Sequence, residues 1–356
     1  STASITDIKY TDSVKLTTNG FSLVGYTFAG WKDEKGTSYI GGQTVSKLAS
    51  QNGAEVKLYA QWSANKYTVS FVSEKLTDAT VGSMPANIPV TFDSAFVTSI
   101  SVPVAAGYTF LGWYTTGGVA VTNGEGTVNS TVAGFITAGK WTLANNATFE
   151  AKWQANGYTI KFVGKAPATT SNDVKNTMDD ISATFATEVT LTDNAYTLEG
   201  YTFAGWLYNG ETYADGATVK NLTTELNKVV ELVSQWTANK YTIAFDANVP
   251  ETATTTVSGS TANLSMTYDQ AKALTENGFV LEGYTFAGWT FGENTYTNGA
   301  TVNNLSATNG ATVTLKATWT QNDIKVTFNI GAHGSTDTTE KTVKFNGTYG
   351  TLPAVT

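Results

Sequence analysis

The chain has no cysteine among its 356 residues, and it also has no arginine and only one histidine. Without cysteine, neither disulfide bonds nor thiolate metal sites can hold the fold together. Without arginine, the chain lacks the planar donor fork that recognises phosphate and carboxylate groups in pairs. These absences exclude a disulfide-stapled scaffold and disfavour a phosphate-binding site.

Positive charge and long apolar runs are also scarce. Because 21 basic residues face 29 acidic ones, the net charge is −8 at pH 7. No basic stripe exists that could release counterions, so we expect no nucleic-acid partner. No apolar run reaches the roughly 18 residues of a membrane-spanning helix, so we expect no membrane insertion.

The composition and the first residues bear on where the protein acts. The opening STASITDIKYTD has neither the basic start nor the apolar stretch of a signal peptide. Abundant Thr, Ser, Asn, Gly and Tyr without cysteine suit an extracellular protein of the bacterial cell surface. We therefore expect that location, with any secretion signal or wall anchor outside this chain.

One aromatic motif, GYTFxGW, occurs at 25–31, 107–113, 200–206 and 283–289. A second tryptophan follows each copy, in LYAQW, FEAKW, LVSQW and LKATW. The second tryptophans at 153, 236 and 319 are evenly spaced, whereas the segment 129–146, which contains Trp141, is an insertion. Such self-similarity predicts an array of repeats, each a small structural unit.

The repeats set the expected domain boundaries. Only four residues separate Trp62 from Tyr67, which is too short for a flexible linker between units. The predicted units are a partial repeat without its first strand at 1–63, three full repeats at 64–154, 155–237 and 238–320, and a partial repeat with the first two strands at 321–356.

Each unit is predicted to hold about four strands and one short helix. In KYTIAF, Tyr241, Ile243 and Phe245 alternate with polar residues, as in a half-buried strand. The segment 269–278 is typical of one or two helical turns capped by Asp269 and ended by Asn277-Gly278. In GYTFxGW, the glycine before the tryptophan is predicted to form a bulge that turns the tryptophan toward the core.

The repeated aromatics could be a ligand platform or a core anchor, and their alternation favours the core. Burying one large aromatic side chain stabilises a fold by roughly 1.5–3 kcal/mol, which matters in so small a unit. The predicted core motif is Tyr26, Phe28, Gly30, Trp31 and Trp62; Tyr108, Phe110, Gly112, Trp113 and Trp153; Tyr201, Phe203, Gly205, Trp206 and Trp236; and Tyr284, Phe286, Gly288, Trp289 and Trp319.

With GYTFxGW followed by LYAQW-like segments at matched spacing, the sequence resembles the Listeria–Bacteroides repeat, the B-repeat type of internalins and other large bacterial surface proteins. The resemblance covers essentially the whole chain. It implies a β-grasp unit, a small mixed sheet over a short helix, and hence an α+β, β-dominated fold class. It also implies tandem arrays that form elongated stalks, and it brings no catalytic residues.

Candidate sites outside the motif are weak. His333 lies in an expected exposed loop, and the acidic pairs Asp33/Glu34 and Asp179/Asp180 do not recur between units. We therefore expect no catalytic residue, metal or cofactor. Tyr39, Tyr213 and Tyr296 lie on expected turns and are candidates for a shallow ligand surface.

The sequence thus predicts a non-enzymatic stalk or spacer of an adhesin-like surface protein. One alternative is a module that binds a surface glycan or a host protein. Another is a fibre or surface-layer subunit that self-associates end to end by strand addition through its partial repeats. Against strand addition, KTVKFNG at 341–347 aligns with DIKYTDS at 7–13, so that a swap would duplicate one strand.

Overall fold

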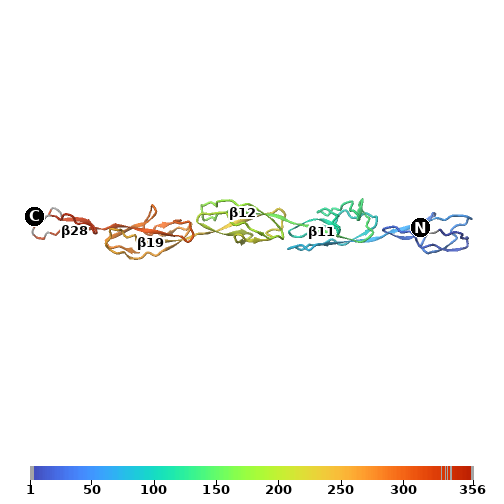
Figure 1. Ribbon diagram of the computed structural model, residues 1–356, viewed down its shortest axis with the longest axis horizontal. Coiled ribbons are helices and arrows are strands. Elements are labelled where there is room, and N and C mark those ends of the chain that lie inside the picture. The colour runs from blue at the N-terminus through green and yellow to red at the C-terminus, as the bar shows by residue number, and fades with distance from the viewer. Residues whose placement is uncertain (1–3, 330, 333, 335, 337–338, 354–356) are drawn as a thin grey trace. The chain divides into compact units, whose positions relative to one another are not determined.

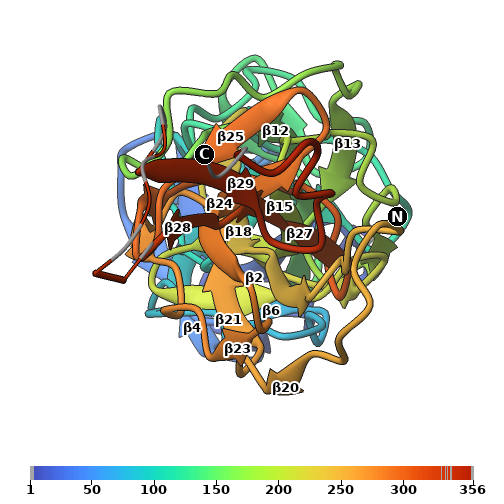
Figure 2. The same cartoon turned by 90° about the vertical axis from the view of Figure 1, so that its left-hand side faces the viewer.

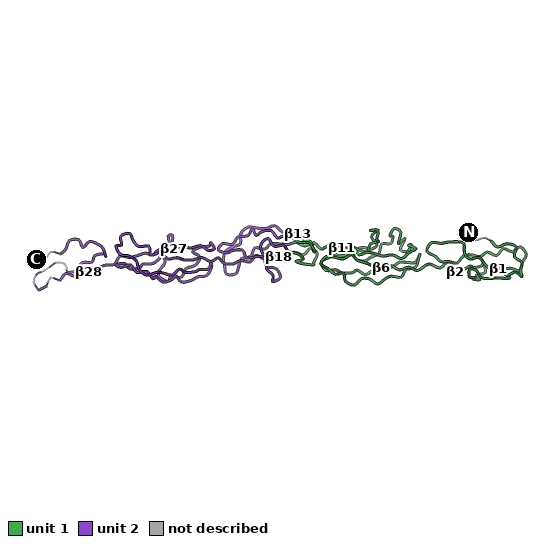
Figure 3. The backbone as a smooth tube through the Cα atoms, turned by 60° about the horizontal axis from the view of Figure 1, so that its bottom comes forward, with its two compact units in different colours: residues 1–159, 182–189, 219–230 green, residues 160–181, 190–218, 231–356 purple. Residues whose placement is uncertain are grey.

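The computed structural model describes residues 4–329, 331, 332, 334, 336 and 339–353. These residues form strands, turns and loops (Figure 1). The chain divides into two compact units, which Figure 3 colours green (residues 1–159, 182–189 and 219–230) and purple (residues 160–181, 190–218 and 231–356).

The expected α+β class and the β-grasp unit are wrong, because the described residues contain no helix. In the segment 269–278, Asp269 has a φ of 59°, and Lys272–Ala273 forms the short strand β22. Leu274 is the one buried apolar side chain of that segment, at 3% exposure. A helix needs an apolar stripe over several turns, and this segment offers only one anchoring point. The fold is therefore all-β.

In the first unit, β2 lies at the centre of a three-stranded sheet and β6 and β11 lie at the centre of a four-stranded sheet. The three-stranded sheet has the order β3-β2-β5, with β3 Ser38–Tyr39, β2 Tyr26–Asp33 and β5 Leu58–Ala64, beside the pair β1 Ser13–Lys15 and β4 Thr44–Ser46. The four-stranded sheet has the order β7-β6-β11-β8, with β7 Ile88–Thr91, β6 Lys66–Ser73, β11 Ala147–Ala155 and β8 Tyr108–Thr115, beside the hairpin β9 Ile136–Thr137 and β10 Lys140–Trp141.

In the second unit, the five-stranded sheet around β19 and β27 arranges its central strands as the four-stranded sheet around β6 and β11 does. Its order is β21-β19-β27-β24-β25, with β21 Leu264–Thr267, β19 Lys240–Asp246, β27 Thr312–Gln321, β24 Tyr284–Phe291 and β25 Asn294–Tyr296. Short pairs accompany it: β20 Ser258–Gly259 with β23 Phe279–Val280, β22 with β26 Thr301–Val302, and β28 Asp323–Thr327 with β29 Glu340–Lys344, the last shown in red in Figure 2.

A further five-stranded sheet is formed by residues between 157 and 238. Its order is β13-β12-β18-β15-β16, with β13 Ile181–Thr184, β12 Gly157–Val163, β18 Val229–Ala238, β15 Tyr201–Tyr208 and β16 Glu211–Tyr213, and the pair β14 Val189–Thr190 and β17 Thr218–Val219 accompanies it.

One topological rule applies to the sheets around β6 and β19. The opening strand pairs in parallel with the closing strand, as β6 does with β11 and β19 with β27. The GYTFxGW strand then pairs antiparallel on the other side of the closing strand. The first and last strands of these repeats are therefore neighbours at the centre of the sheet.

The bulge expected in GYTFxGW is present. The register shifts between Phe28 and Gly30, and the same shift occurs at Gly205 and Gly288. At 107–113 the pairing skips Leu111 in the same way, because Phe110 faces Trp153 and Gly112 faces Lys152. The glycine at this position has a φ of 128–141°, and a Cβ there would come closer than 3.0 Å to a carbonyl oxygen of the adjacent segment. The position therefore requires glycine.

The bulge places the motif tryptophan in the core. Trp113, Trp206 and Trp289 are 0% exposed, and Trp31 is 5% exposed. The phenylalanine three residues earlier meets each tryptophan edge-on, with ring centroids 4.8–5.5 Å apart. The closing tryptophans Trp62, Trp153, Trp236 and Trp319 are half-buried. They pack against the motif phenylalanines Phe28, Phe110, Phe203 and Phe286 at centroid distances of 5.3–5.9 Å.

The segment 129–146 adds to the core of the four-stranded sheet. Trp141 on β10 is fully buried, and its ring lies 5.5 Å from that of Phe96 and 6.5 Å from that of Phe149. This segment therefore enlarges the core around Trp113 rather than forming an exposed loop.

Candidate functional site: the repeat junctions

Each of the three tyrosines considered for a shallow ligand surface is half-buried and lies on a strand of its own sheet. Tyr39 is half-buried and donates a hydrogen bond from its hydroxyl to Asp33 Oδ2 at 2.9 Å. Burial, and then this bond to the carboxylate, raise the pKa of Tyr39. Tyr213 and Tyr296 are half-buried and lie opposite Trp206 and Trp289 in the strand pairing. The three rings belong to three different sheets.

The first tyrosine of each GYTFxGW motif packs against an aromatic ring of the following repeat. Tyr26 meets Phe92 edge-on, with ring centroids 5.4 Å apart and an interplanar angle of 76°. The three later motifs repeat this contact at 5.6–6.1 Å and 73–76°, in the pairs Tyr108–Phe185, Tyr201–Tyr268 and Tyr284–Phe345. Edge-on aromatic pairs of this kind are worth about 0.5–1.5 kcal/mol beyond the area they bury. We call Phe92, Phe185, Tyr268 and Phe345 the junction rings.

Each junction ring also covers the glycine that precedes the tyrosine. These junction glycines, Gly25, Gly107, Gly200 and Gly283, have φ values of 78–82°. A Cβ on any of them would overlap atoms of the junction ring. Glycine is therefore needed at this position for two reasons, the left-handed backbone and the ring that lies on it.

One asparagine connects each repeat to the next. Asn65 is the single residue between β5 and β6, and Asn156, Asn239 and Asn322 stand alone in the same way between β11 and β12, β18 and β19, and β27 and β28. We call these four residues the junction asparagines. A connection of one residue between two strands contains no flexible segment, so the backbone cannot bend there as a flexible linker would.

Each junction asparagine is hydrogen-bonded to both repeats. Its backbone N–H donates to the carbonyl oxygen of the junction glycine at 2.8–2.9 Å, and its carbonyl oxygen accepts from the backbone N–H of the junction ring residue at 2.8–3.0 Å. Its side-chain Oδ1 accepts from a threonine hydroxyl at 2.6 Å, in the pairs Thr27–Asn65, Thr109–Asn156, Thr202–Asn239 and Thr285–Asn322. The same three bonds thus recur at all four junctions.

The junctions differ in the contacts around this common set. At the first one, the Tyr26 hydroxyl donates to Asp93 Oδ2 at 3.3 Å, and Lys140 forms an ion pair with Asp93 at 3.1 Å. At the second one, Lys220 Nζ lies 2.6 Å from Asp78 Oδ2, and Asn221 Nδ2 donates to the same oxygen at 2.9 Å. The hydrogen bonds from Lys220 and Asn221 lower the pKa of Asp78.

At the third junction, the carboxylate of Asp269 gathers several donors. The hydroxyl of Tyr201 donates to Asp269 Oδ2 at 3.0 Å, and Asn304 Nδ2 donates to Oδ1 at 2.7 Å. Burial alone would raise the pKa of Asp269, but the hydrogen bonds from Asn304, Thr170 and Tyr201 outweigh it and lower the pKa. The carboxylate therefore stays charged and bonded at neutral pH.

Sequence reasoning missed the junction residues. It assigned Tyr26, Tyr108, Tyr201 and Tyr284 to the core of their own repeat, whereas their rings contact the next repeat. The signal was present as three recurring features: a glycine before each YTF, an asparagine after each closing tryptophan, and an aromatic residue ending each second-strand segment. Periodicity could not reveal which of the aromatics face across a junction.

The described residues offer little for other chemistry. Among them, no group of three His, Asp or Glu side chains is placed to hold a metal ion. No helix in the described part of the chain is long and apolar enough to cross a membrane. His333 lies outside the described residues.

Comparison with known proteins identifies the repeat. The profile of the Listeria–Bacteroides repeat domain matches residues 1–61, 67–134 and 241–318, which together are more than half of the chain. A "Putative Gly-rich membrane protein" of Evansella cellulosilytica is 28% identical over 238 residues, which are 64% of this chain and 24% of that protein. A "Putative membrane protein" of the same organism is 24% identical over 317 residues, which are 87% of this chain and 41% of that protein.

Internalin H of Listeria monocytogenes is also similar, at 37% identity over 92 residues, which are 25% of this chain and 14% of that protein. The chain therefore spans less than half the length of each of these curated relatives. Similarity to an internalin and to membrane proteins associates the repeat with the cell surface.

Proposed function

The chain belongs to the Listeria–Bacteroides repeat family, and on this premise we propose that it is a non-enzymatic structural stalk or spacer of a bacterial cell-surface or secreted adhesin-like protein. The observation that carries the proposal is the repeated junction. A spacer must keep a fixed separation between what lies at its two ends. A junction with a one-residue connection and the same bonds each time suits that task.

The proposal places the chain outside the cell. The similarity to an internalin and to membrane proteins supports this location, and so does a composition without cysteine. In the proposed role, the junctions and cores are the functional parts. The variable contacts around each junction, such as Asp78 with Lys220, adjust how firmly two repeats are held together.

Small-angle X-ray scattering of the chain in dilute solution tests the proposal. A compact repeat of about 80 residues has a diameter of roughly 25–30 Å from the size scaling of domains, so three full repeats in line predict a particle on the order of 80–90 Å or longer. Distances that long at every dilution would support the spacer. A compact particle would overturn it.

A further inference from the structure

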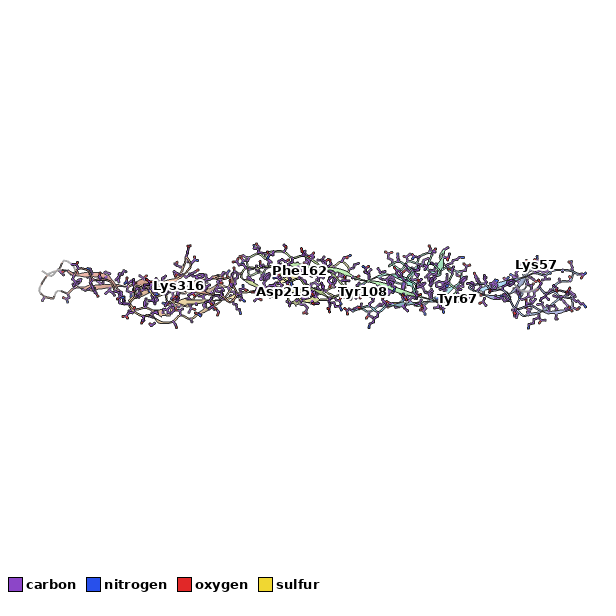
Figure 4. All side chains as sticks on the ribbon, in the orientation of Figure 1. Lys57, Tyr67, Tyr108, Phe162, Asp215 and Lys316 are labelled. Carbon is purple, nitrogen blue, oxygen red and sulfur yellow. The ribbon has the colours of Figure 1, made fainter. Side chains whose placement is uncertain are left out.

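The connection that follows the opening strand of a repeat reaches the junction with the next repeat. We call these connections straps; they are residues 74–87, between β6 and β7, and residues 164–180, between β12 and β13. The hydroxyl of Tyr108, labelled in Figure 4, donates to the carbonyl oxygen of Thr77 at 3.0 Å. The hydroxyls of Tyr201 and Thr169 are hydrogen-bonded to each other at 3.3 Å. Each strap therefore lies on the tyrosine whose ring meets the next repeat.

One asparagine of the next repeat is held in the same way at the second and third junctions. Asn221 and Asn304 have φ values of 55° and 53°. The Oδ1 of each accepts, at 2.6 Å, the backbone N–H of the residue that follows the junction ring, which is Ala186 or Asp269. Ala186 and Asp269 also share a left-handed backbone, with φ values of 63° and 59°. The two junctions therefore have the same local backbone around the side-chain Nδ2 of this asparagine.

This Nδ2 donates to one carboxylate at each of the two junctions, but the carboxylate comes from opposite sides. At the second junction it belongs to the strap, because Asn221 Nδ2 donates to Asp78 Oδ2 at 2.9 Å. At the third junction it belongs to the next repeat, because Asn304 Nδ2 donates to Asp269 Oδ1 at 2.7 Å. The strap there supplies a hydroxyl instead, since Thr170 donates to the carboxylate of Asp269.

The two sources of the carboxylate exclude each other at both junctions. Where the strap carries Asp78, the residue after the junction ring is Ala186. Where Asp269 follows the junction ring, the strap carries Thr170. A second carboxylate at either place would compete for the same Nδ2 and repel the first, because two carboxylates that share one site cannot both stay charged without a cost in free energy.

We propose that the strap of one repeat and the residue after the junction ring of the next form a matched pair, which holds at most one carboxylate and decides which repeats stack firmly on each other. A neutral pair is compatible too: at the fourth junction, Asn346 Nδ2 donates to Thr254 Oγ1 at 2.7 Å. A pair of carboxylates is the mismatch, and its repulsion lets closely similar repeats reject a wrong neighbour. The inference rests on the proposed spacer function, because it names what selects neighbours within the array.

The third junction gives the cleaner test. At the second junction, Lys220 Nζ lies 2.6 Å from Asp78 Oδ2 and would offset an added negative charge. At the third junction, the residue in the place of Lys220 is Asn303, which is exposed and neutral. Thr170→Asp therefore adds a second carboxylate beside Asp269 without a lysine at that position. Thr170→Asn, which has the same shape as the aspartate but no charge, is the matched control.

Hydrogen exchange of two backbone N–H groups reports directly on this junction. The N–H of Asn239 and that of Tyr268 are hydrogen-bonded across it at 2.8 and 2.9 Å. At pH 7 we expect both to exchange at least about fivefold faster in Thr170→Asp than in Thr170→Asn, a coupling of ordinary size for groups in contact. The N–H of Asn156, which is bonded in the same way at the second junction, is the internal reference and should keep the rate of the parent protein.

A second background shows whether the pairing of charges is the cause. In Asp269→Asn the third junction has lost its own carboxylate, so adding Thr170→Asp should leave the exchange unchanged or slow it. The same acceleration with and without the charge of Asp269 would overturn the proposal, and so would equal rates in Thr170→Asp and Thr170→Asn. Neither result depends on the scattering of the parent chain, so a failed pairing rule and a failed spacer function are distinguished.

Discussion

The junction glycine is required for two reasons: its left-handed backbone and the junction ring that lies on it. A matched pair of substitutions can separate the two effects. Gly107 has a φ of 79° and lies under the ring of Phe185. Gly118 has a φ of 81°, and no atom lies within 4 Å of the place its Cβ would take. Alanine at either site strains the backbone by about 1–2 kcal/mol.

We expect Gly107→Ala to destabilise the protein by about 1–3 kcal/mol more than Gly118→Ala does, because the added methyl group collides with the junction ring. Denaturant unfolding of the two variants and the parent measures the difference. Equal losses of stability would show that the ring moves aside freely and that the junction is loosely packed.

The motif tryptophan is the largest buried side chain at its site. Trp206 is 0% exposed and contacts the rings of Phe162 and Phe203. We expect Trp206→Ala to cost about 3–5 kcal/mol, because it leaves a large cavity in a small core. Hydrogen exchange within residues 200–238 is the suitable measurement, with Trp206→Phe as a milder control. A loss below about 1 kcal/mol, the size of a surface effect, would contradict a core role.

At the scale of elements, the ion pair between Asp78 and Lys220 makes the second junction dependent on pH. The pKa of Asp78 is lowered in the folded protein, so this carboxylate stabilises the fold above its ordinary pKa of about 3.9 and loses that contribution as the pH falls through the folded value. The pKa of Lys220 is raised, mainly by its hydrogen bond to Asp78, so the pair persists until the pH is strongly alkaline.

We therefore expect Asp78→Asn to lower the melting temperature at pH 6, and to lower it progressively less as the pH falls below the ordinary pKa of an aspartate, where the parent protein loses the same contribution. Thermal melting of both proteins across this range measures the difference. If the melting temperatures of the parent and the variant differed by the same amount at every pH, the charge of Asp78 would not contribute to the stability of the junction.

Much of the element order, but not the fold class, follows from the sequence alone. The strands and the bulge at Gly205 and Gly288 are signalled by alternation and by a glycine that breaks it. The prediction of a helix at 269–278 was wrong. The capping residues of this segment suit a helix, but its one buried leucine is too little apolar surface to hold a helix against the sheet. Local capping signals do not decide an element that has no apolar face to bury.

The candidate site was harder to predict than the strands. Which way Tyr201 points depends on the path of the chain through Asn239, since that residue brings Tyr268 beside it. Such a contact joins residues from two repeats, and alternation within one repeat carries no information about it.

At the scale of the whole molecule, the stiffness of the connection through each junction asparagine can be tested. When spin labels are attached to the parent protein through Asp215→Cys and Glu293→Cys, we expect one narrow distribution of the distance between the two labels. Inserting Gly-Ser-Gly-Ser between Asn239 and Lys240 adds a flexible segment with a root-mean-square span of about 10–12 Å, so the distribution should broaden while both repeats stay folded. Equal widths would show that the junction is already flexible in the parent.

The parallel pairing of opening and closing strands also decides how a repeat meets a pulling force. The chain enters the four-stranded sheet through β6 and leaves it through β11, and these strands are hydrogen-bonded neighbours from Val69 with Ala147 to Ser73 with Ala151. Tension along the chain would slide one strand past the other, loading all of these bonds together rather than opening them one at a time. Because all of these hydrogen bonds must break together, we expect a sheet with this topology to resist a stretching force strongly.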